Sequence, residues 1–132
     1  IVIILAGIND IAENTGPMTL EETAGNIFSM AQLAKAANIK VIISSVLPAN
    51  TFPWRPEIKP AEKVIELNIL LKQYCEENRI TYLDYYSHMV DDKKGLDSRY
   101  GDDGVHPNLA GYKVMEGLVE NAIKSALEKN GK

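Results

Sequence analysis

Cysteine is almost absent from this chain: Cys75 is the single one in 132 residues, which excludes an internal disulfide framework. Long apolar runs are absent too. The longest, at residues 1–6, is far shorter than the roughly 20 residues of a membrane-spanning helix. Basic residues do not predominate, because 14 Lys and Arg stand against 18 Asp and Glu and give a net charge of −4. A nucleic-acid surface would need clustered Lys and Arg, so these absences argue against nucleic acid as a partner and against a membrane span.

The residues that are present suit one globular domain. Hydrophobic residues make up 45% of the sequence and charged residues 24%, which is ordinary for a globular chain. A length of 132 residues allows one domain at most. The sequence starts inside its most apolar stretch, Ile1 to Leu5, where a domain rarely begins. We therefore expect residues 1–132 to be the C-terminal portion of a single domain that is truncated at its N-terminus.

Apolar runs alternate with helical patterns along the chain. Ile1 to Leu5 is a continuous apolar run rich in β-branched residues, which predicts a strand buried on both faces. Thr19 and Glu22 form a capping box, and Asn38 and Asn78 suit left-handed helix ends. Further strands are predicted at Lys40 to Val46 and Ile80 to Leu83, and helices from Thr19 to about Ala37, from Pro60 to about Glu77, from Tyr85 to Val90 and after Asn108.

This order of strands and helices predicts an α/β fold. Strands that alternate with helices form a parallel sheet with right-handed crossovers, and helices cover both of its faces. Functional sites in such sheets form beyond the carboxyl ends of the strands. Residues 7–10 follow the first predicted strand, Ser44 and Ser45 lie near the carboxyl end of the second, and Asp84 follows the third. The loop that holds residues 103–106 can reach the same edge. We expect a functional site at that edge.

The stretch from Asp102 to Asn108 contains an aspartate and a histidine whose spacing suits acid–base chemistry. His106 lies three residues after Asp103, so the carboxylate can orient one ring nitrogen while the other accepts a proton. The same pattern occurs by chance and in metal sites. A metal hydrolase that uses Asp102, Asp103 and His106 is therefore an alternative, although these residues are close in sequence and no second ligand cluster is evident.

Asn9 is a candidate hydrogen-bond donor at the end of the first predicted strand. Its side-chain amide can donate two hydrogen bonds and could stabilise a developing oxyanion. From residue type alone, the favoured alternative is that Asn9 and Asp10 form an Asx turn or a helix cap.

Together the two stretches resemble the motifs of the SGNH hydrolases, also called the GDSL family of lipases and esterases. Gly7-Ile8-Asn9-Asp10, after a buried strand, is similar to the block that supplies the oxyanion asparagine. Asp103-Gly104-Val105-His106-Pro107-Asn108, before the last helix, is similar to the block that supplies the acid and the base. Gly111-Tyr112 also fits the family's usual sequence after that block.

The resemblance implies a three-layer flavodoxin-like sheet, incomplete at the N-terminus, and serine-ester hydrolysis without a metal or another cofactor. By this resemblance His106 is the general base, Asp103 orients it, and the Asn9 side chain donates to the oxyanion. Gly7 provides the turn that lets the backbone approach the site. The implied substrate is a small-molecule ester with a short acyl group such as acetyl, carried on a carbohydrate or a lysophospholipid.

The nucleophile of the family is missing from this sequence. Its Gly-Asp-Ser block, and the second block whose glycine donates to the oxyanion, would both precede Ile1. Ser44 and Ser45 end a strand at the edge of the sheet where a site is expected, but they lack the strained turn that exposes a nucleophile. We interpret them as residues that complete the strand and bond to nearby backbone, and we expect the chain alone to turn over esters negligibly. A non-catalytic binding module on the same fold is the alternative function.

Two surfaces carry further expectations. The loop from Ala49 to Pro60 could line a substrate pocket, with Trp54 and Phe52 as apolar walls or as a stacking platform for a sugar, or it could be a surface loop stiffened by proline. If the first strand of the family fold is missing, Ile1 to Leu5 has an open edge without charge or proline. Such an edge is a template for another strand, so we expect self-association through Ile1 to Leu5 or pairing with the missing N-terminal segment.

Overall fold

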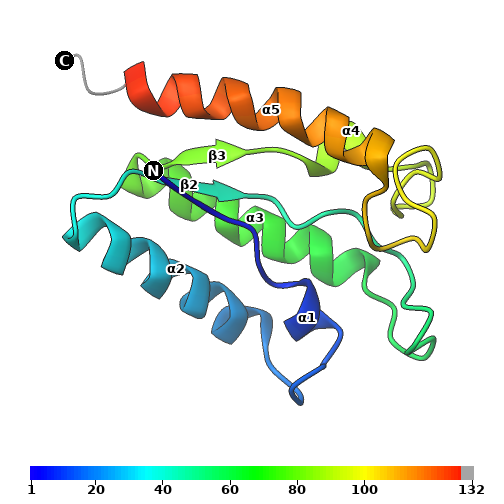
Figure 1. The fold of residues 1–132 in the computed structure, drawn as a ribbon. Coiled ribbons are helices and arrows are strands. Elements are labelled where there is room, and N and C mark those ends of the chain that lie inside the picture. The colour runs from blue at the N-terminus through cyan, green and yellow to red at the C-terminus, as the bar shows by residue number, and fades with distance from the viewer. Residues whose placement is uncertain (129–132) are drawn as a thin grey trace.

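Three parallel strands lie at the centre of the structure, a computed structural model that describes residues 1–128. They are β1 (Val2–Ile4), β2 (Val41–Ser44) and β3 (Thr81–Leu83), in the order β1-β2-β3 (Figure 1). Ile3 pairs with Ile42 in the first ladder, and Ile42 pairs with Thr81 in the second. The parallel pairing confirms the α/β fold that the alternation of strands and helices predicts.

Helices cover the sheet from both sides and make three layers (Figure 1). On one face lie α2 (Leu20–Ala36) and α3 (Ala61–Asn78), and on the other lies α5 (Leu109–Glu128). Two single-turn helices, α1 (Ile8–Ile11) and α4 (Tyr86–Met89), follow β1 and β3. Each face has its own core, because successive strand residues point to opposite sides. The core under α2 and α3 includes Ile4, Ile43, Ile27, Leu67 and Leu71, and the core under α5 includes Ile42, Leu83, Met115, Ala122 and Ala126.

The helix ends mostly follow the local sequence signals. The capping box is present, since the Thr19 hydroxyl accepts from the Glu22 backbone and the Glu22 carboxylate accepts from the Thr19 backbone. Asn38 adopts a left-handed φ of 59°, as expected after α2. The prediction for Asn78 is wrong, because Asn78 is still helical and Arg79 takes the left-handed position with φ 56°.

A helical turn replaces the loop expected after the first strand. Gly7 has φ 119° and starts α1, while Ile11 at the end of the turn and Ala12 after it are almost fully buried. Burying these two side chains stabilises a turn that local propensity does not favour, because apolar burial contributes about 25 cal/mol per Å². The turn places Asn9 at the carboxyl end of β1.

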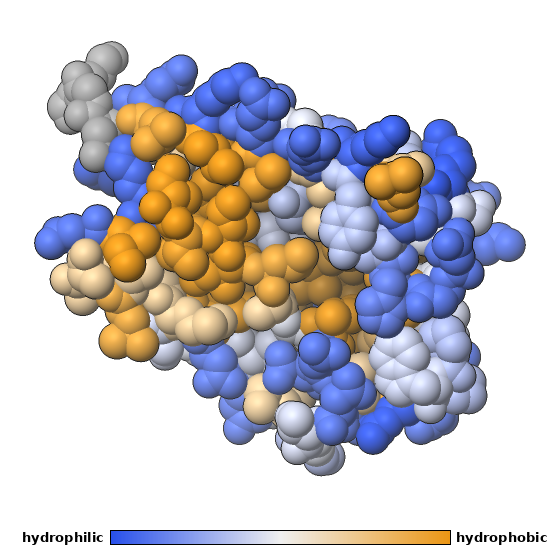
Figure 2. All heavy atoms as spheres, viewed as in Figure 1, coloured by the Kyte–Doolittle hydropathy of each residue, from blue (hydrophilic) through white to orange (hydrophobic). Residues whose placement is uncertain are grey.

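The first strand is not buried on both faces, so that prediction is wrong. Ile4 is buried, but Ile1, Ile3 and Leu5 are 50%, 37% and 45% exposed. The reason is that α5 packs over β2 and β3, and no helix within residues 1–128 covers that side of β1. Figure 2 shows the consequence as an apolar region between β1 and α5.

No helix within residues 1–128 combines the length and the apolar character needed to cross a lipid bilayer.

Candidate active site

A cavity of about 520 Å³ lies at the carboxyl ends of β1 and β2. Its walls come from segments far apart in the sequence: residues 5–10 with Asn14, residues 46–49, Trp54, and residues 105–107. The structure therefore brings Asn9 and His106 to one cavity at the edge of the sheet where parallel α/β proteins bind their ligands.

Asp103 and His106 form a close pair on the loop before α5. The Asp103 Oδ2 atom lies 2.6 Å from His106 Nδ1, while Asp103 Oδ1 accepts from the backbone N–H groups of His106, at 2.7 Å, and Val105, at 2.9 Å. These bonds, led by the backbone N–H of His106, lower the pKa of Asp103 to about 2. The carboxylate is therefore ionised at neutral pH and accepts a hydrogen bond from Nδ1–H, which leaves Nε2 of a neutral ring free to accept a proton.

The start of α5 holds this loop in place. Asn108 Oδ1 accepts from the backbone N–H of Gly111 at 3.0 Å and so caps the helix, as its position in the sequence predicts. A Cβ at Gly111 would lie 2.4 Å from the carbonyl oxygen of Tyr100, so the helix can approach the preceding loop this closely only with glycine there. The His106 side chain, 71% exposed, extends from this anchored segment toward solvent and the cavity.

Gly7 sets the direction of the chain on the other wall. Its φ of 119° favours glycine, and a Cβ there would lie 2.7 Å from Cδ2 of Leu67 on α3. The close approach lets α1 begin directly after β1 and places Asn9 on the cavity wall.

The Asn9 side chain does not cap α1, contrary to the alternative that residue type favours. The structure has no side-chain cap bond at α1, and Asn9 Oδ1 instead accepts from Asn14 Nδ2 at 2.9 Å. No local pattern in the sequence points to Asn14, because its contact with Asn9 depends on the helical turn of α1, which the sequence does not predict.

The loop after β2 contributes one aromatic ring to the cavity. Trp54 lines it, is 46% exposed, and has its ring centroid 6.1 Å from that of His106. The expectation that Phe52 is a wall of the substrate pocket is wrong. Phe52 is fully buried, stacks against Trp54 at 5.2 Å between ring centroids, and does not line the cavity. The loop needs an anchor in the core, and Phe52 is that anchor.

No serine within residues 1–128 lines this cavity. Ser45 is fully buried, and its hydroxyl accepts from the backbone N–H groups of Tyr85 and Tyr86, both at 2.9 Å. Ser44 donates to the carbonyl of Ile4 at 3.3 Å. Both serines bond to neighbouring backbone, as the interpretation of them as strand-completing residues expects.

A second group of serine, histidine and aspartate lies at the start of α4, but its bonds do not suit catalysis. The Ser87 hydroxyl lies 2.7 Å from Asp84 Oδ2, and His88 Nδ1 lies 3.0 Å from the Asp84 carbonyl oxygen. His88 Nδ1 also lies 3.2 Å from Ser87 Oγ. A carbonyl oxygen only accepts, so an Nδ1 that bonds to the Asp84 carbonyl carries the proton and cannot take one from Ser87, whose hydroxyl donates to the Asp84 carboxylate. The Asp84 carboxylate also accepts from the backbone N–H of Ser87 at 3.0 Å, so it binds the first turn of α4.

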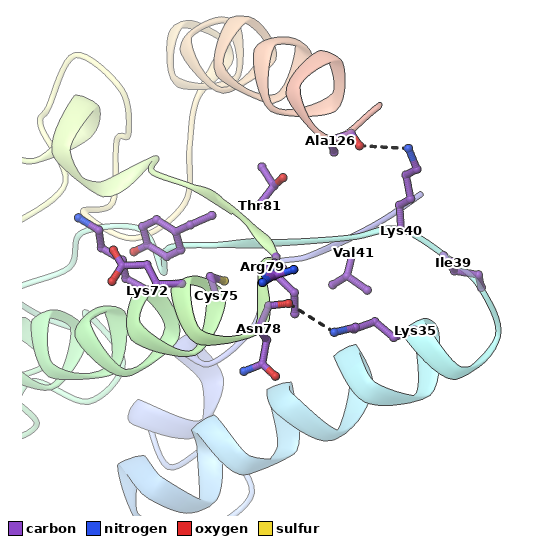
Figure 3. A pocket seen from close by; sticks show the side chains of 13 residues that line it. Lys35, Ile39, Lys40, Val41, Lys72, Cys75, Asn78, Arg79, Thr81 and Ala126 are labelled. Carbon is purple, nitrogen blue, oxygen red and sulfur yellow. Dashed lines mark hydrogen bonds between the residues drawn. The ribbon is translucent and has the colours of Figure 1, made fainter. Parts of the chain in front are cut away.

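A larger cavity, of about 860 Å³, lies at the opposite ends of the strands (Figure 3). Its rim holds four cationic side chains, and two of them bind backbone carbonyls near helix ends. Lys35 Nζ lies 3.4 Å from the Asn78 carbonyl oxygen, and Lys40 Nζ lies 3.1 Å from that of Ala126 (Figure 3). Cations at helix C-termini offset the helix dipole. Among residues 1–128, no histidine lines this cavity. The other cations on the rim are Lys72 and Arg79.

Within residues 1–128, no three His, Cys, Asp or Glu side chains are grouped as metal ligands would be. In the set proposed as an alternative, Asp103 and His106 instead bond to each other, and Asp102 bonds to Asn108. Asp103 accepts three bonds from residues 105 and 106, and Asp102 Oδ1 lies 3.3 Å from Asn108 Nδ2.

Comparison with known proteins identifies relatives over most of the chain. Residues 1–114 match the model of the GDSL-like Lipase/Acylhydrolase family. A GDSL-like lipase from Bacteroides thetaiotaomicron has a similar structure, with a TM-score of 0.91 and 51% identity over 95% of this chain and 62% of that chain. A structure from Bacteroides fragilis is similar at a TM-score of 0.93 and 51% identity, over 96% of this chain and 62% of that chain.

A more distant structure shows the same fold. An acetylxylan esterase from Geobacillus stearothermophilus matches with a TM-score of 0.70 and 18% identity, over 92% of this chain and 58% of that chain. No curated protein matches the sequence. The chain spans 62% of the length of each of the two Bacteroides structures.

Proposed function

Because the chain belongs to the GDSL-like lipase/acylhydrolase family, a family of carboxylic ester hydrolases, we propose that its 520 Å³ cavity is part of an ester-hydrolysing site. One observation carries the proposal: Asn9 and the Asp103-bonded His106 line one cavity although they are almost a hundred residues apart. A base and an oxyanion donor that share a cavity are two of the parts that acyl transfer to a hydroxyl nucleophile needs.

Each of the three residues has a role in this proposal. His106 Nε2 removes the proton of the attacking hydroxyl and later returns it to the departing alcohol. Asp103 holds Nδ1 and favours the imidazolium, and its pKa of about 2 keeps it charged throughout. Asn9 Nδ2 donates to the oxyanion of the tetrahedral intermediate.

The nucleophile in this proposal is a serine outside residues 1–132. The cavity is lined by no serine within the described residues, and Ser44 and Ser45 are buried and bonded to backbone. The chain alone is therefore proposed to hydrolyse aryl esters negligibly, since its base has no hydroxyl to activate.

The substrate in this proposal is a small ester with a short acyl group, carried on a carbohydrate or a lysophospholipid. The half-exposed ring of Trp54 supports a sugar, because an exposed aromatic face can stack on a sugar ring. The apolar side chains Leu5, Val46 and Leu47 on the same cavity wall support an acyl group.

A chimera tests the proposal. Residues 1–128 replace the matched segment of the Bacteroides thetaiotaomicron lipase, and turnover of p-nitrophenyl acetate is compared among that lipase, the chimera and this chain alone. We expect turnover by the first two and none by the third. Robust turnover by this chain alone that survives Ser45→Ala but not His106→Ala would show that the nucleophile is an activated water and not a serine.

A non-catalytic binding module is the second candidate function, and the lack of a serine on the cavity wall favours it. A folded chimera that binds acetylated xylooligosaccharide, yet hydrolyses no ester although the parent lipase does, would support this candidate over the first. Comparing aryl acetate, acetylated xylooligosaccharide and lysophosphatidylcholine as substrates separates the proposed ester classes.

We also propose that the chain self-associates through β1. Within residues 1–128, β1 pairs with β2 alone. The exposed side chains of Ile3 in β1 and of Ile1 and Leu5 beside it carry no charge. An unpaired apolar edge is a template for another strand. Sedimentation at micromolar concentration should find dimers or larger species. A stable monomer would contradict self-association and would leave pairing with a further segment of the protein as the explanation of the open edge.

A further inference from the structure

The usefulness of Asn9 depends on which end of its amide faces the cavity. An asparagine side chain has an NH₂ group that donates and an oxygen that accepts. An oxyanion is stabilised by donors alone, so a reversed amide would place an oxygen against the developing negative charge. Whatever contacts the Asn9 oxygen therefore decides whether the residue assists or opposes the proposed reaction.

The Asn9 oxygen is held by Asn14. Asn14 Nδ2 donates to Asn9 Oδ1 at 2.9 Å, and the backbone N–H of Asn14 donates to the Asn9 carbonyl at 3.0 Å. Both residues line the cavity. With its oxygen engaged by Asn14, the Asn9 amide has its NH₂ end left for the cavity.

The backbone between the two residues is shaped for this contact. Ile11 and Ala12 are buried and fix the end of α1, and Glu13 then adopts the left-handed region with φ 55°. A residue other than glycine rarely takes that conformation, which costs about 1 kcal/mol or more. At Glu13 the chain reverses direction and brings Asn14 back over Asn9. The left-handed backbone of Glu13 and the side-chain contact between Asn14 and Asn9 therefore depend on each other.

We propose that Asn14 is the positioning residue for the oxyanion donor: it binds the Asn9 oxygen and thereby turns the Asn9 NH₂ group toward the cavity. The inference rests on the proposed function, because it concerns the donor of that same site. Asn14 itself does not touch the reacting atoms in this account and acts through Asn9.

Side-chain amide NMR of the ¹⁵N-labelled chain tests the inference without any need for turnover. The probe is acetate, the carboxylate product of an acetyl ester, at millimolar concentration. In the unsubstituted chain we expect the Asn9 NH₂ signals to shift as acetate binds. Asn14→Ala should reduce that response about fivefold, the population change expected from the loss of one hydrogen bond.

Two further variants separate orientation from general damage. Asn14→Asp introduces a carboxylate that attracts the Asn9 NH₂ group, so the Asn9 signals should move strongly downfield and stop responding to acetate. Asn26→Ala is the matched control, because Asn26 is an asparagine on α2 whose side chain bonds to Met18 and does not line the cavity. It should leave the Asn9 response unchanged.

The coupling across the hydrogen bond distinguishes failure of the inference from failure of the proposed function. Scalar coupling from Asn14 Nδ2 to Asn9 Cγ should be present in the unsubstituted chain, with or without acetate. If the coupling is present but acetate shifts neither Asn9 nor His106, the positioning contact stands and the proposed function fails. An unchanged Asn9 response in Asn14→Ala, or coupling in the opposite sense from Asn9 Nδ2 to Asn14, would overturn the inference.

Discussion

At the carboxyl ends of the strands, a cavity of about 520 Å³ has Asn9, Trp54 and His106 in its walls. At the amino ends, a larger cavity of about 860 Å³ has Lys35, Lys40, Lys72 and Arg79 around it. The larger cavity is where α2, α3 and α5 end. Two of its lysines, Lys35 and Lys40, bind carbonyls near the ends of α3 and α5. The smaller one receives the loops that leave the strands.

The contrast shows that the topology of the sheet gives its two ends different roles. In a βαβ unit every helix runs back to the start of the next strand, so helix C-termini gather at one end and need cations. Loops that follow the strands gather at the other end, and their side chains remain available for a ligand. Size alone would favour the amino-end cavity, whereas the chemistry of the lining residues favours the carboxyl-end cavity as the candidate site.

The largest expected difference between the two ends is in catalysis. In the chimera with the Bacteroides thetaiotaomicron lipase, His106→Ala should lower kcat/KM for p-nitrophenyl acetate by about 10³-fold, because a general base contributes about 10²–10⁴-fold. Arg79→Ala, at the amino-end cavity, should leave kcat/KM unchanged. Equal losses in the two variants would show that the amino-end cavity takes part in the reaction.

The next largest effect concerns the support of the carboxyl-end cavity. Phe52→Ala should lower the free energy of unfolding by about 3–5 kcal/mol, because the side chain is fully buried beneath Trp54. Trp54→Ala, which removes a half-exposed ring, should cost clearly less. Urea unfolding followed by circular dichroism measures both, and a small loss in Phe52→Ala would mean that the loop is held by other contacts.

A pH titration tests how strongly the loop at the carboxyl-end cavity holds the Asp103 carboxylate in its charged form. The folded pKa of Asp103, about 2, lies below the ordinary value near 3.9, so its carboxylate stabilises the fold above about pH 4. That contribution is lost as the pH falls toward 2, where the folded protein takes up the proton. The ¹³C signal of the Asp103 carboxyl should therefore titrate with a midpoint near pH 2.

The same titration separates the two sources of the Asp103 shift. His106→Ala removes the ring contact but keeps the backbone N–H bonds from residues 105 and 106, so the midpoint should rise only part of the way. A midpoint at the ordinary aspartate value in the unsubstituted chain would show that the loop does not hold the carboxylate as described.

The smallest expected effect lies at the amino end. Lys40→Met removes the contacts of Lys40 Nζ with the carbonyls of Ala126 and Leu127 and should cost about 0.3–1 kcal/mol of stability. Lys72→Met, a change of equal charge at the same cavity, is the control and should cost less. A loss in Lys40→Met as large as that in Phe52→Ala would show that the amino end is as important for stability as the carboxyl end.

Local patterns in the sequence were sufficient for the fold class and for the candidate residues. The alternation of apolar runs and helical patterns gives a parallel α/β sheet, because each run is too short for anything but a strand and each helix must return the chain to the same edge. The capping box at Thr19 and the cap at Asn108 follow from side chains within three residues of their partners. Likewise, the contact between Asp103 and His106 spans three residues, so spacing alone suggests it.

Only the tertiary structure decided which residues share a wall and which are covered. Asn9 and His106 line one cavity because β1 and the loop before α5 reach the same edge of the sheet, and no short-range signal in the sequence connects them.

Burial was also decided by packing. Phe52 and Trp54 are both aromatic and close in sequence, yet packing buries Phe52 and leaves Trp54 half-exposed. The bond from Asn14 to Asn9 needs the turn of α1, which burial of Ile11 and Ala12 stabilises. One face of β1 is open because α5 crosses only β2 and β3. Each of these outcomes depends on contacts between segments that are distant in the sequence. Local sequence patterns do not reveal how strongly such segments interact.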